Sequence, residues 1–279
     1  MSHNKGILQP EDYAEPRCLL CDEPYGKAPA VKPVPQQRII EKMNDYMSRR
    51  DYAGAERHLL YWLEEAKLGH DKGGELMLRG ELVGHYRKTG EKEKAFASAQ
   101  EALRLVDELQ MDGTVSAGTA YVNIATAYNA FGENEQSIAL FEKAKAAYEA
   151  NNTAPELRGG LYNNMALTNV ALGRYEEALA LYAQALDMME QVENGALDQA
   201  ITYLNMADTA VAQYGAEQAE HRVNELLDKA YDLLLLPTLQ HDGYYAFVCE
   251  KCAPVFSYYG YFMAANELRQ RAEAIYERD

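Results

Sequence analysis

Tyr162-Asn163-Asn164-Met165-Ala166 is a stretch that recurs twice in this chain, as Tyr121-Val122-Asn123-Ile124-Ala125 and as Tyr203-Leu204-Asn205-Met206-Ala207. Each copy has the pattern Tyr-x-Asn-(Ile/Met)-Ala, and neighbouring copies are 41 residues apart. A fixed period of this length is typical of proteins that stack one supersecondary unit many times. The sequence therefore predicts a repeat array with one continuous core.

Turn residues recur with the same period and divide each repeat into two parts. Gly132 and Gly173 each lie seven residues after the alanine of the preceding copy. With Arg50, Gly90 and Tyr214 as the corresponding turn positions elsewhere, the turns are 40 to 42 residues apart. Apolar residues on both sides of these turns follow a helical period. Each repeat is therefore expected to be a hairpin of two helices.

Helix-stop residues separate the predicted hairpins. They are Asp112-Gly113, Asn151-Asn152 with Pro155, Asn194-Gly195, and Pro237 with Asp242-Gly243. Glycine and asparagine commonly end helices, and proline cannot continue one. We therefore expect an all-α fold of about six helical hairpins over residues 36–279. The first hairpin is degenerate in sequence, because a terminal repeat has one face in solvent.

Residues 1–35 differ in composition from the rest of the chain. They hold six of its nine prolines and the pair Cys18/Cys21. Proline lacks a backbone donor and disfavours helix in the residue before it. This segment is therefore expected to be an extended arm, which is either disordered or docked against the repeats.

The charge balance restricts the classes of partner. The chain has 43 acidic and 27 basic residues, which gives a net charge of −16. Such a surface repels nucleic acid and anionic lipid, so neither is expected to bind. The N-terminal residues lack the apolar region of a secretory signal, and the leucine run Leu233–Leu236 is too short to cross a bilayer. We therefore expect a cytoplasmic protein.

The residues around Gly173 resemble the tetratricopeptide repeat (TPR). The matching positions are Tyr162, Met165 and Ala166 before the turn, and Ala178, Tyr182, Ala185 and Leu186 after it. The common TPR has about 34 residues, whereas these units have 41 or 42. In this respect the chain is similar to the extended repeats of kinesin light chain and of the peptide-pheromone receptors of Gram-positive bacteria. The resemblance implies a right-handed superhelical solenoid whose first helices line a concave groove.

The repeated asparagines Asn123, Asn164 and Asn205 are the leading candidates for a binding site. In TPR proteins that hold extended peptides, an asparagine at this position contacts the peptide backbone or its carboxylate, and the resemblance implies the same role here. An amide can both donate and accept, so it can pair with a peptide group of any sequence. The alternative is that these residues bridge neighbouring helices within the array. Further groove candidates in the same register are Arg87, Lys88, Thr126, Asn129, Asn163 and Asp208.

Two Cys-x-x-Cys pairs have a spacing that is common among metal ligands. Cys249 and Cys252 fall on packing positions of the last hairpin, where free cysteine is a common core residue. Cys18 and Cys21 lie in the arm, in a setting that often supplies two zinc ligands. We expect no metal or other cofactor. The alternative is a zinc ion held by all four cysteines, with the arm docked in the groove of its own array.

The sequence contains no catalytic motif, so we expect a non-catalytic scaffold that binds a protein or peptide. A peptide-responsive regulatory sensor, in which a ligand closes the superhelix, is the first alternative. A zinc-stabilised scaffold with the arm of residues 1–35 docked on it is the second.

Overall fold

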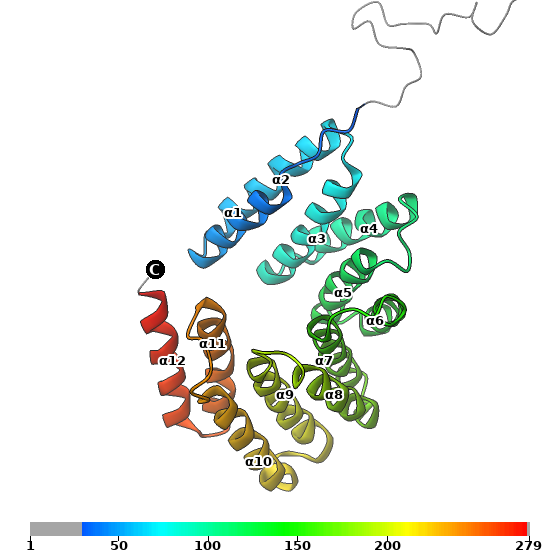
Figure 1. Cartoon of the computed structure of the whole chain (residues 1–279). Helices are drawn as coiled ribbons and strands as arrows, with labels where there is room; N and C mark the ends of the chain where they lie inside the picture. The colour runs from blue at the N-terminus through cyan, green and yellow to red at the C-terminus, as the bar shows by residue number, and fades with distance from the viewer. Residues whose placement is uncertain (1–29, 278–279) are drawn as a thin grey trace, which may run out of the picture.

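The computed structural model describes residues 30–277, and this range contains twelve α-helices and no β-strand. The helices are α1 (Gln36–Ser48), α2 (Tyr52–Leu68), α3 (Lys72–Thr89), α4 (Lys92–Glu108), α5 (Val115–Ala130), α6 (Asn134–Ala150), α7 (Pro155–Ala171), α8 (Tyr175–Met189), α9 (Ala196–Tyr214), α10 (Ala216–Leu234), α11 (Gly243–Tyr258) and α12 (Phe262–Tyr276). Successive helices pair as six hairpins (Figure 1). The predicted all-α solenoid of hairpins is confirmed.

The turn inside each hairpin has one residue with positive φ. It is a glycine in five hairpins, namely Gly90, Gly132, Gly173, Gly215 and Gly260, and Arg50 in the first. Glycine enters this region without the steric cost that a Cβ imposes. The predicted turn at Tyr214 is wrong by one residue, because Tyr214 is the last residue of α9 and the left-handed residue is Gly215.

Polar caps fix where several helices begin. The side chains of Asp51, Asp71, Thr114 and Asp242 accept hydrogen bonds from backbone N–H groups in the first turns of α2, α3, α5 and α11. These bonds satisfy donors that have no partner within the helix. Pro155 opens α7, where its missing N–H costs nothing. The boundaries between hairpins thus follow local chemistry that is visible in the sequence.

Small buried residues allow the helices to approach one another closely. The alanines of the repeated pattern, Ala125, Ala166 and Ala207, are fully buried. Val83 in α3 and Ala253 in α11 occupy the corresponding positions and are also fully buried. Buried apolar side chains from both helices of each hairpin fill the space around them. The core therefore extends along the whole array.

The array curves until its two ends meet (Figure 1). Helices α3, α5, α7, α9 and α11 lie on the inner side of the curve, and α4, α6, α8, α10 and α12 lie outside them. Arg50, in the turn between α1 and α2, forms an ion pair with Glu250 of α11, with an Nη2–Oε1 distance of 2.7 Å. Exposed ion pairs contribute about 0–1 kcal/mol. The closure is therefore weak compared with the packing of the hairpins.

The segment before α1 contacts the connection between α2 and α3. The backbone N–H of Lys32 donates to the Gly69 carbonyl at 2.8 Å, and that of Val34 donates to Asp71 Oδ2 at 2.9 Å. Val34 is buried. The remainder of the predicted arm, including Cys18 and Cys21, lies outside the described residues, so its docking in the groove stays a prediction.

Candidate partner-binding site

One side chain from each inner helix between α3 and α11 occupies the same repeat position, two residues before a fully buried valine or alanine. We call this set the inner row: Glu81, Asn123, Asn164, Asn205 and Lys251. The side chains of Asn123 and Lys251 are exposed, and the other three are half-buried. The sequence predicted the three asparagines. The sequence did not predict Glu81 and Lys251, because α3 and α11 lack the Tyr-x-Asn pattern.

Neighbouring helices of the inner layer are in direct contact around this row. The Asn205 Nδ2 atom donates to Asn163 Oδ1 at 3.2 Å, which joins α9 to α7. A Cβ added at Gly80 of α3 would lie 3.8 Å from Asn123 Nδ2 of α5. The structure therefore places the predicted residues Asn163 and Asn205 together, and Asn205 bridges helices as the sequence-based alternative proposed.

The remaining predicted groove residues differ in what they offer. Lys88 Nζ lies 5.6 Å from the ring centroid of Tyr52, so this ammonium group turns toward α2. Arg87 is exposed, but desolvation by neighbouring protein atoms lowers the pKa of its guanidinium. The Thr126 hydroxyl donates to the Val122 carbonyl at 2.7 Å, so its proton is used within α5. Asn129 is half-buried at the end of the same helix.

Tyrosines of α11 hydrogen-bond to two aspartates of α9. The Tyr244 hydroxyl donates to Asp198 Oδ1 at 2.8 Å, and the Tyr259 hydroxyl donates to Asp208 Oδ1 at 2.6 Å. Desolvation raises the pKa of both aspartates, although each tyrosine bond acts in the opposite direction. The sequence predicted Asp208 and missed Asp198, because nothing in the local pattern marks a partner 46 residues away.

Three carboxylates of the inner helices, Glu81, Asp198 and Asp208, form no ion pair within residues 30–277. Desolvation raises the pKa of Glu81, and no other influence on this carboxyl is resolved. Desolvation is also the largest influence on the pKa of Asp198, and the positive charge of Lys251 lowers this pKa only slightly. Loss of hydration destabilises an ionised carboxylate unless a cation or donor compensates it. This face can therefore accept N–H groups and positive charge from a bound segment.

The cysteines of α11 are core residues. Cys249 and Cys252 are 0% and 1% exposed. Desolvation raises the pKa of the Cys249 thiol, and it raises that of Cys252 to about 12. Both are therefore neutral thiols at physiological pH and pack as small apolar residues. A zinc site shared with Cys18 and Cys21 stays a prediction.

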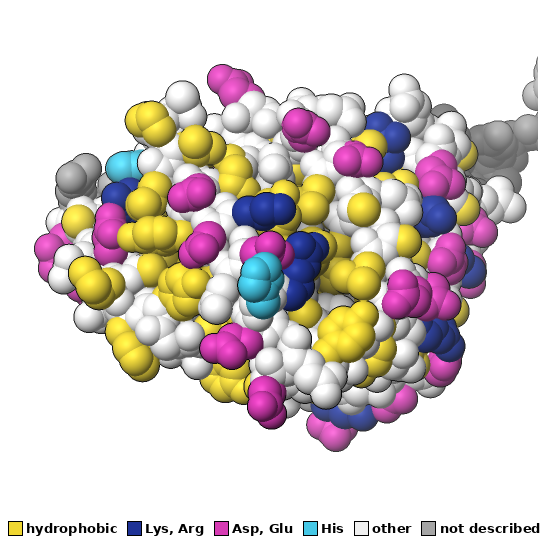
Figure 2. All heavy atoms as spheres, turned by 90° about the horizontal axis from the view of Figure 1, so that it is seen from below, with side chains coloured by type: hydrophobic (Ala, Val, Ile, Leu, Met, Phe, Trp, Pro, Cys, Tyr) yellow, Lys and Arg dark blue, Asp and Glu magenta, His cyan; other side chains and the backbone are white. Residues whose placement is uncertain are grey.

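An outer face of the array has a mixed character. Figure 2 shows Lys and Arg side chains interspersed with Asp and Glu on this face, without a basic patch. At the turn between α11 and α12, Tyr258, Phe262 and Met263 are exposed. Exposed apolar groups of this size offer a second surface for a partner.

Within residues 30–277, no helix combines the length and apolar character needed to cross a membrane.

Comparisons with known proteins agree with this architecture. Family models described as tetratricopeptide repeat match residues 118–151 and 157–231. The crystal structure of BtubC (BKLC) from P. vanneervenii is similar over 82% of this chain and 90% of that chain, with 21% identity and a TM-score of 0.53.

TPR-like repeats of a protein described as a kinesin light chain, from Podosopora anserina, match 71% of this chain and 92% of their own, with 18% identity and a TM-score of 0.48. No curated protein matches the sequence. The repeated Tyr-x-Asn-(Ile/Met)-Ala pattern, the six hairpins and the family matches lead to one conclusion: residues 118–151 and 157–231 of this chain are tetratricopeptide repeats.

Proposed function

We propose that this protein is a non-catalytic interaction scaffold that holds an extended segment of a partner protein along the inner row. The observation that carries the proposal is the row itself, with three asparagines between an acidic residue, Glu81, and a basic residue, Lys251. TPR proteins generally mediate protein–protein interactions, which supports the broader function.

Asparagines in the row suit recognition of a peptide backbone. Each amide offers a donor and an acceptor, so it can pair with the N–H and C=O groups of an extended chain without regard to its side chains. Asn123 is the most available of them because its side chain is exposed, whereas Asn205 already donates to Asn163. The carboxylates of α9 add acceptors for basic side chains of the partner. We therefore expect a partner segment that is extended and carries positive charge.

Selection from a phage-displayed peptide library, followed by fluorescence anisotropy with the selected peptide, tests the proposal. Asn123→Ala combined with Asn164→Ala should weaken binding by about tenfold, or about 1.4 kcal/mol, with little change in Tm. Gln218→Ala removes an exposed amide from the outer helix α10 and is the matched control. If the double variant binds as tightly as Gln218→Ala, the peptide does not lie on the inner row.

A peptide-responsive sensor is the second candidate, and the ion pair between Arg50 and Glu250 favours it. This contact joins the two ends of the array and has a small energy. A bound segment that contacts both ends would shift the balance between closed and open arrays. Small-angle X-ray scattering with and without the selected peptide measures this shift. An unchanged radius of gyration at saturation would exclude the sensor.

A further inference from the structure

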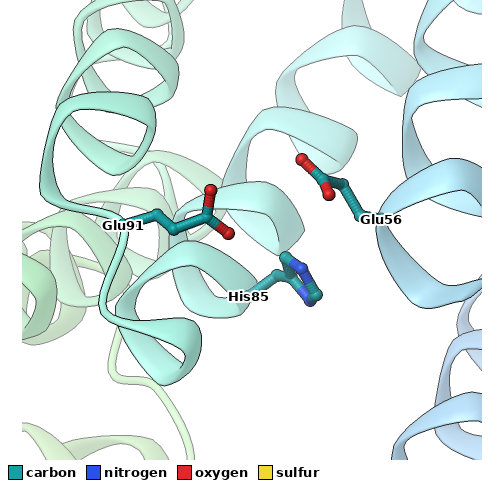
Figure 3. A group of neighbouring side chains, drawn as sticks. All are labelled: Glu56, His85 and Glu91. Atoms are coloured by element: carbon teal, nitrogen blue, oxygen red, sulfur yellow. The ribbon is translucent and has the colours of Figure 1, made fainter. Parts of the chain in front are cut away.

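Three side chains of metal-ligand type meet where the first hairpin packs on the second. They are Glu56 of α2, His85 of α3 and Glu91, which precedes α4. One nitrogen of the His85 ring and one oxygen of each carboxylate all lie within 4.8 Å of one another. Figure 3 shows the two carboxylates pointing toward each other from separate elements, with the imidazole close to both. The sequence gives no sign of this group, because its members come from α2, α3 and the connection before α4.

His85 has an unpaired polar atom in this group. The residue is 3% exposed, and its Nδ1 atom is buried without a hydrogen-bond partner among the described residues. A buried polar atom without a partner costs free energy, so each case calls for an explanation such as an absent ion. Neutral imidazole is also a common metal ligand, and burial favours the neutral form of this side chain.

The two carboxylates already share a cation. Lys94 Nζ lies 2.9 Å from Glu56 Oε1 and 2.6 Å from Glu91 Oε2. Its side chain is 51% exposed, so it can leave the site for solvent without disturbing the core. Hydroxyl groups orient the same carboxylates, since Tyr86 donates to Glu56 at 3.0 Å and Thr89 donates to Glu91 at 3.1 Å. Such supporting bonds are typical around metal ligands.

We propose that Glu56, His85 and Glu91 bind a divalent transition-metal ion such as Zn²⁺, which displaces the Lys94 ammonium. One nitrogen and two oxygens suit zinc, which takes these ligands at about 2.0–2.2 Å. Ligand atoms around a tetrahedral ion lie about 3.3 Å apart, so the side chains have to contract by about 1.5 Å at most from their present separation. A fourth position stays open to water. The bound ion links α2, α3 and the start of α4, and thereby ties the first hairpin to the second.

Isothermal titration calorimetry with zinc chloride alone tests the proposal. The full chain carries Cys18→Ser and Cys21→Ser, so that the thiols of the arm do not contribute. We expect saturable binding of one equivalent of Zn²⁺ and a higher Tm in its presence, because a ligand that binds only the folded state stabilises it. Magnesium chloride alone should give no saturable heat, because Mg²⁺ prefers oxygen ligands in octahedral geometry.

Variants in the same Cys18→Ser, Cys21→Ser background assign the ligands. Lys94→Ala should bind Zn²⁺ at least tenfold more tightly, because it removes the competing cation. Glu91→Gln and His85→Gln should each bind at least tenfold more weakly. Glu91 lies near the surface, so Glu91→Gln should fold, and its zinc affinity tests the proposal even if His85→Gln does not fold. Glu101→Gln alters an exposed carboxylate of α4 that pairs with Arg104, and it should bind as the background protein does.

The proposal is overturned by any of three results. The first is the absence of saturable zinc binding in the protein that carries Cys18→Ser and Cys21→Ser. The second is zinc affinity that Glu91→Gln leaves unchanged. The third is weaker binding in Lys94→Ala, which would mean that the lysine orders the site and does not compete for it.

Discussion

Gly118 in α5 lies so close to a tyrosine that replacing it with alanine should not stabilise the helix as this change normally does. A Cβ at this position would lie 2.6 Å from Tyr148 Cε1 and 2.9 Å from Cδ1. Tyr148 is 2% exposed, and its hydroxyl is 3.0 Å from Thr119 Oγ1. The ring is therefore enclosed by protein, and its hydroxyl contact resists displacement. We predict that Gly118→Ala loses the stability that alanine normally brings to a helix.

Two glycines of α7 provide internal comparisons. Gly159 is 41 residues after Gly118, and Met189 is 41 residues after Tyr148. A Cβ at Gly159 would lie 2.5 Å from Met189 Cε, the flexible end of a side chain that can adopt another rotamer. A Cβ at Gly160 would meet nothing within 4 Å. All three glycines therefore lie within a helix, and they differ in the neighbour that an added Cβ would meet.

The expected energies follow from two opposing effects. Alanine is favoured over glycine within a helix by about 0.8–1 kcal/mol, so Gly160→Ala should stabilise the protein by about that amount. Overpacking a well-filled core costs about 1–3 kcal/mol. Gly118→Ala should therefore range from neutral to about 2 kcal/mol destabilising. Gly159→Ala should fall between the two, because the Met189 methyl group can move aside.

Thermal unfolding of the three variants under one set of conditions measures this order. For a chain of this size, 1 kcal/mol corresponds to a shift in Tm of about 2–4 °C. The double variant Gly118→Ala with Tyr148→Met places beside the new alanine the residue type that Met189 supplies in the next repeat, and it should show a coupling energy of about 0.5–3 kcal/mol. If Gly118→Ala melts as high as Gly160→Ala, the helices α5 and α6 are not packed as closely as described.

Three further predictions concern charge, closure and a buried hydroxyl. Desolvation raises the pKa of Glu81, so ionisation of this carboxyl destabilises the folded state, and Glu81→Gln should raise Tm at pH 7. It should not raise Tm at pH 3, where the carboxyl is protonated in both the folded and the unfolded state, and equal shifts at the two pH values would contradict the prediction. Arg50→Ala breaks the ion pair with Glu250 and should increase the distance between spin labels on α2 and α12, and 1 M salt should have the same effect on the unaltered protein. A distance that does not change in the variant would mean that packing, and not the ion pair, closes the array. Ser137→Ala should cost about 1 kcal/mol in urea unfolding, because the buried hydroxyl donates to the Ala125 carbonyl at 2.7 Å; no loss would show that this bond contributes nothing.

The sequence by itself determined the repeat unit, because the relevant physics is local. The period of the Tyr-x-Asn-(Ile/Met)-Ala pattern, the apolar spacing and the turn residues each act within a few residues. They placed the helices and their connections, apart from the shift from Tyr214 to Gly215. The asparagines of the inner row were predicted for the same reason, since a repeated position points to the same side of every hairpin.

Only the tertiary structure decided which residues from different repeats meet. The closure through Arg50 and Glu250 depends on a small rotation between neighbouring hairpins, added over the whole array. The bond from Tyr244 to Asp198 depends on how α11 packs on α9. The group around His85 depends on how the first hairpin meets the second. None of these contacts has a local sequence pattern, because the geometry that creates them is a property of packed helices and not of any one segment.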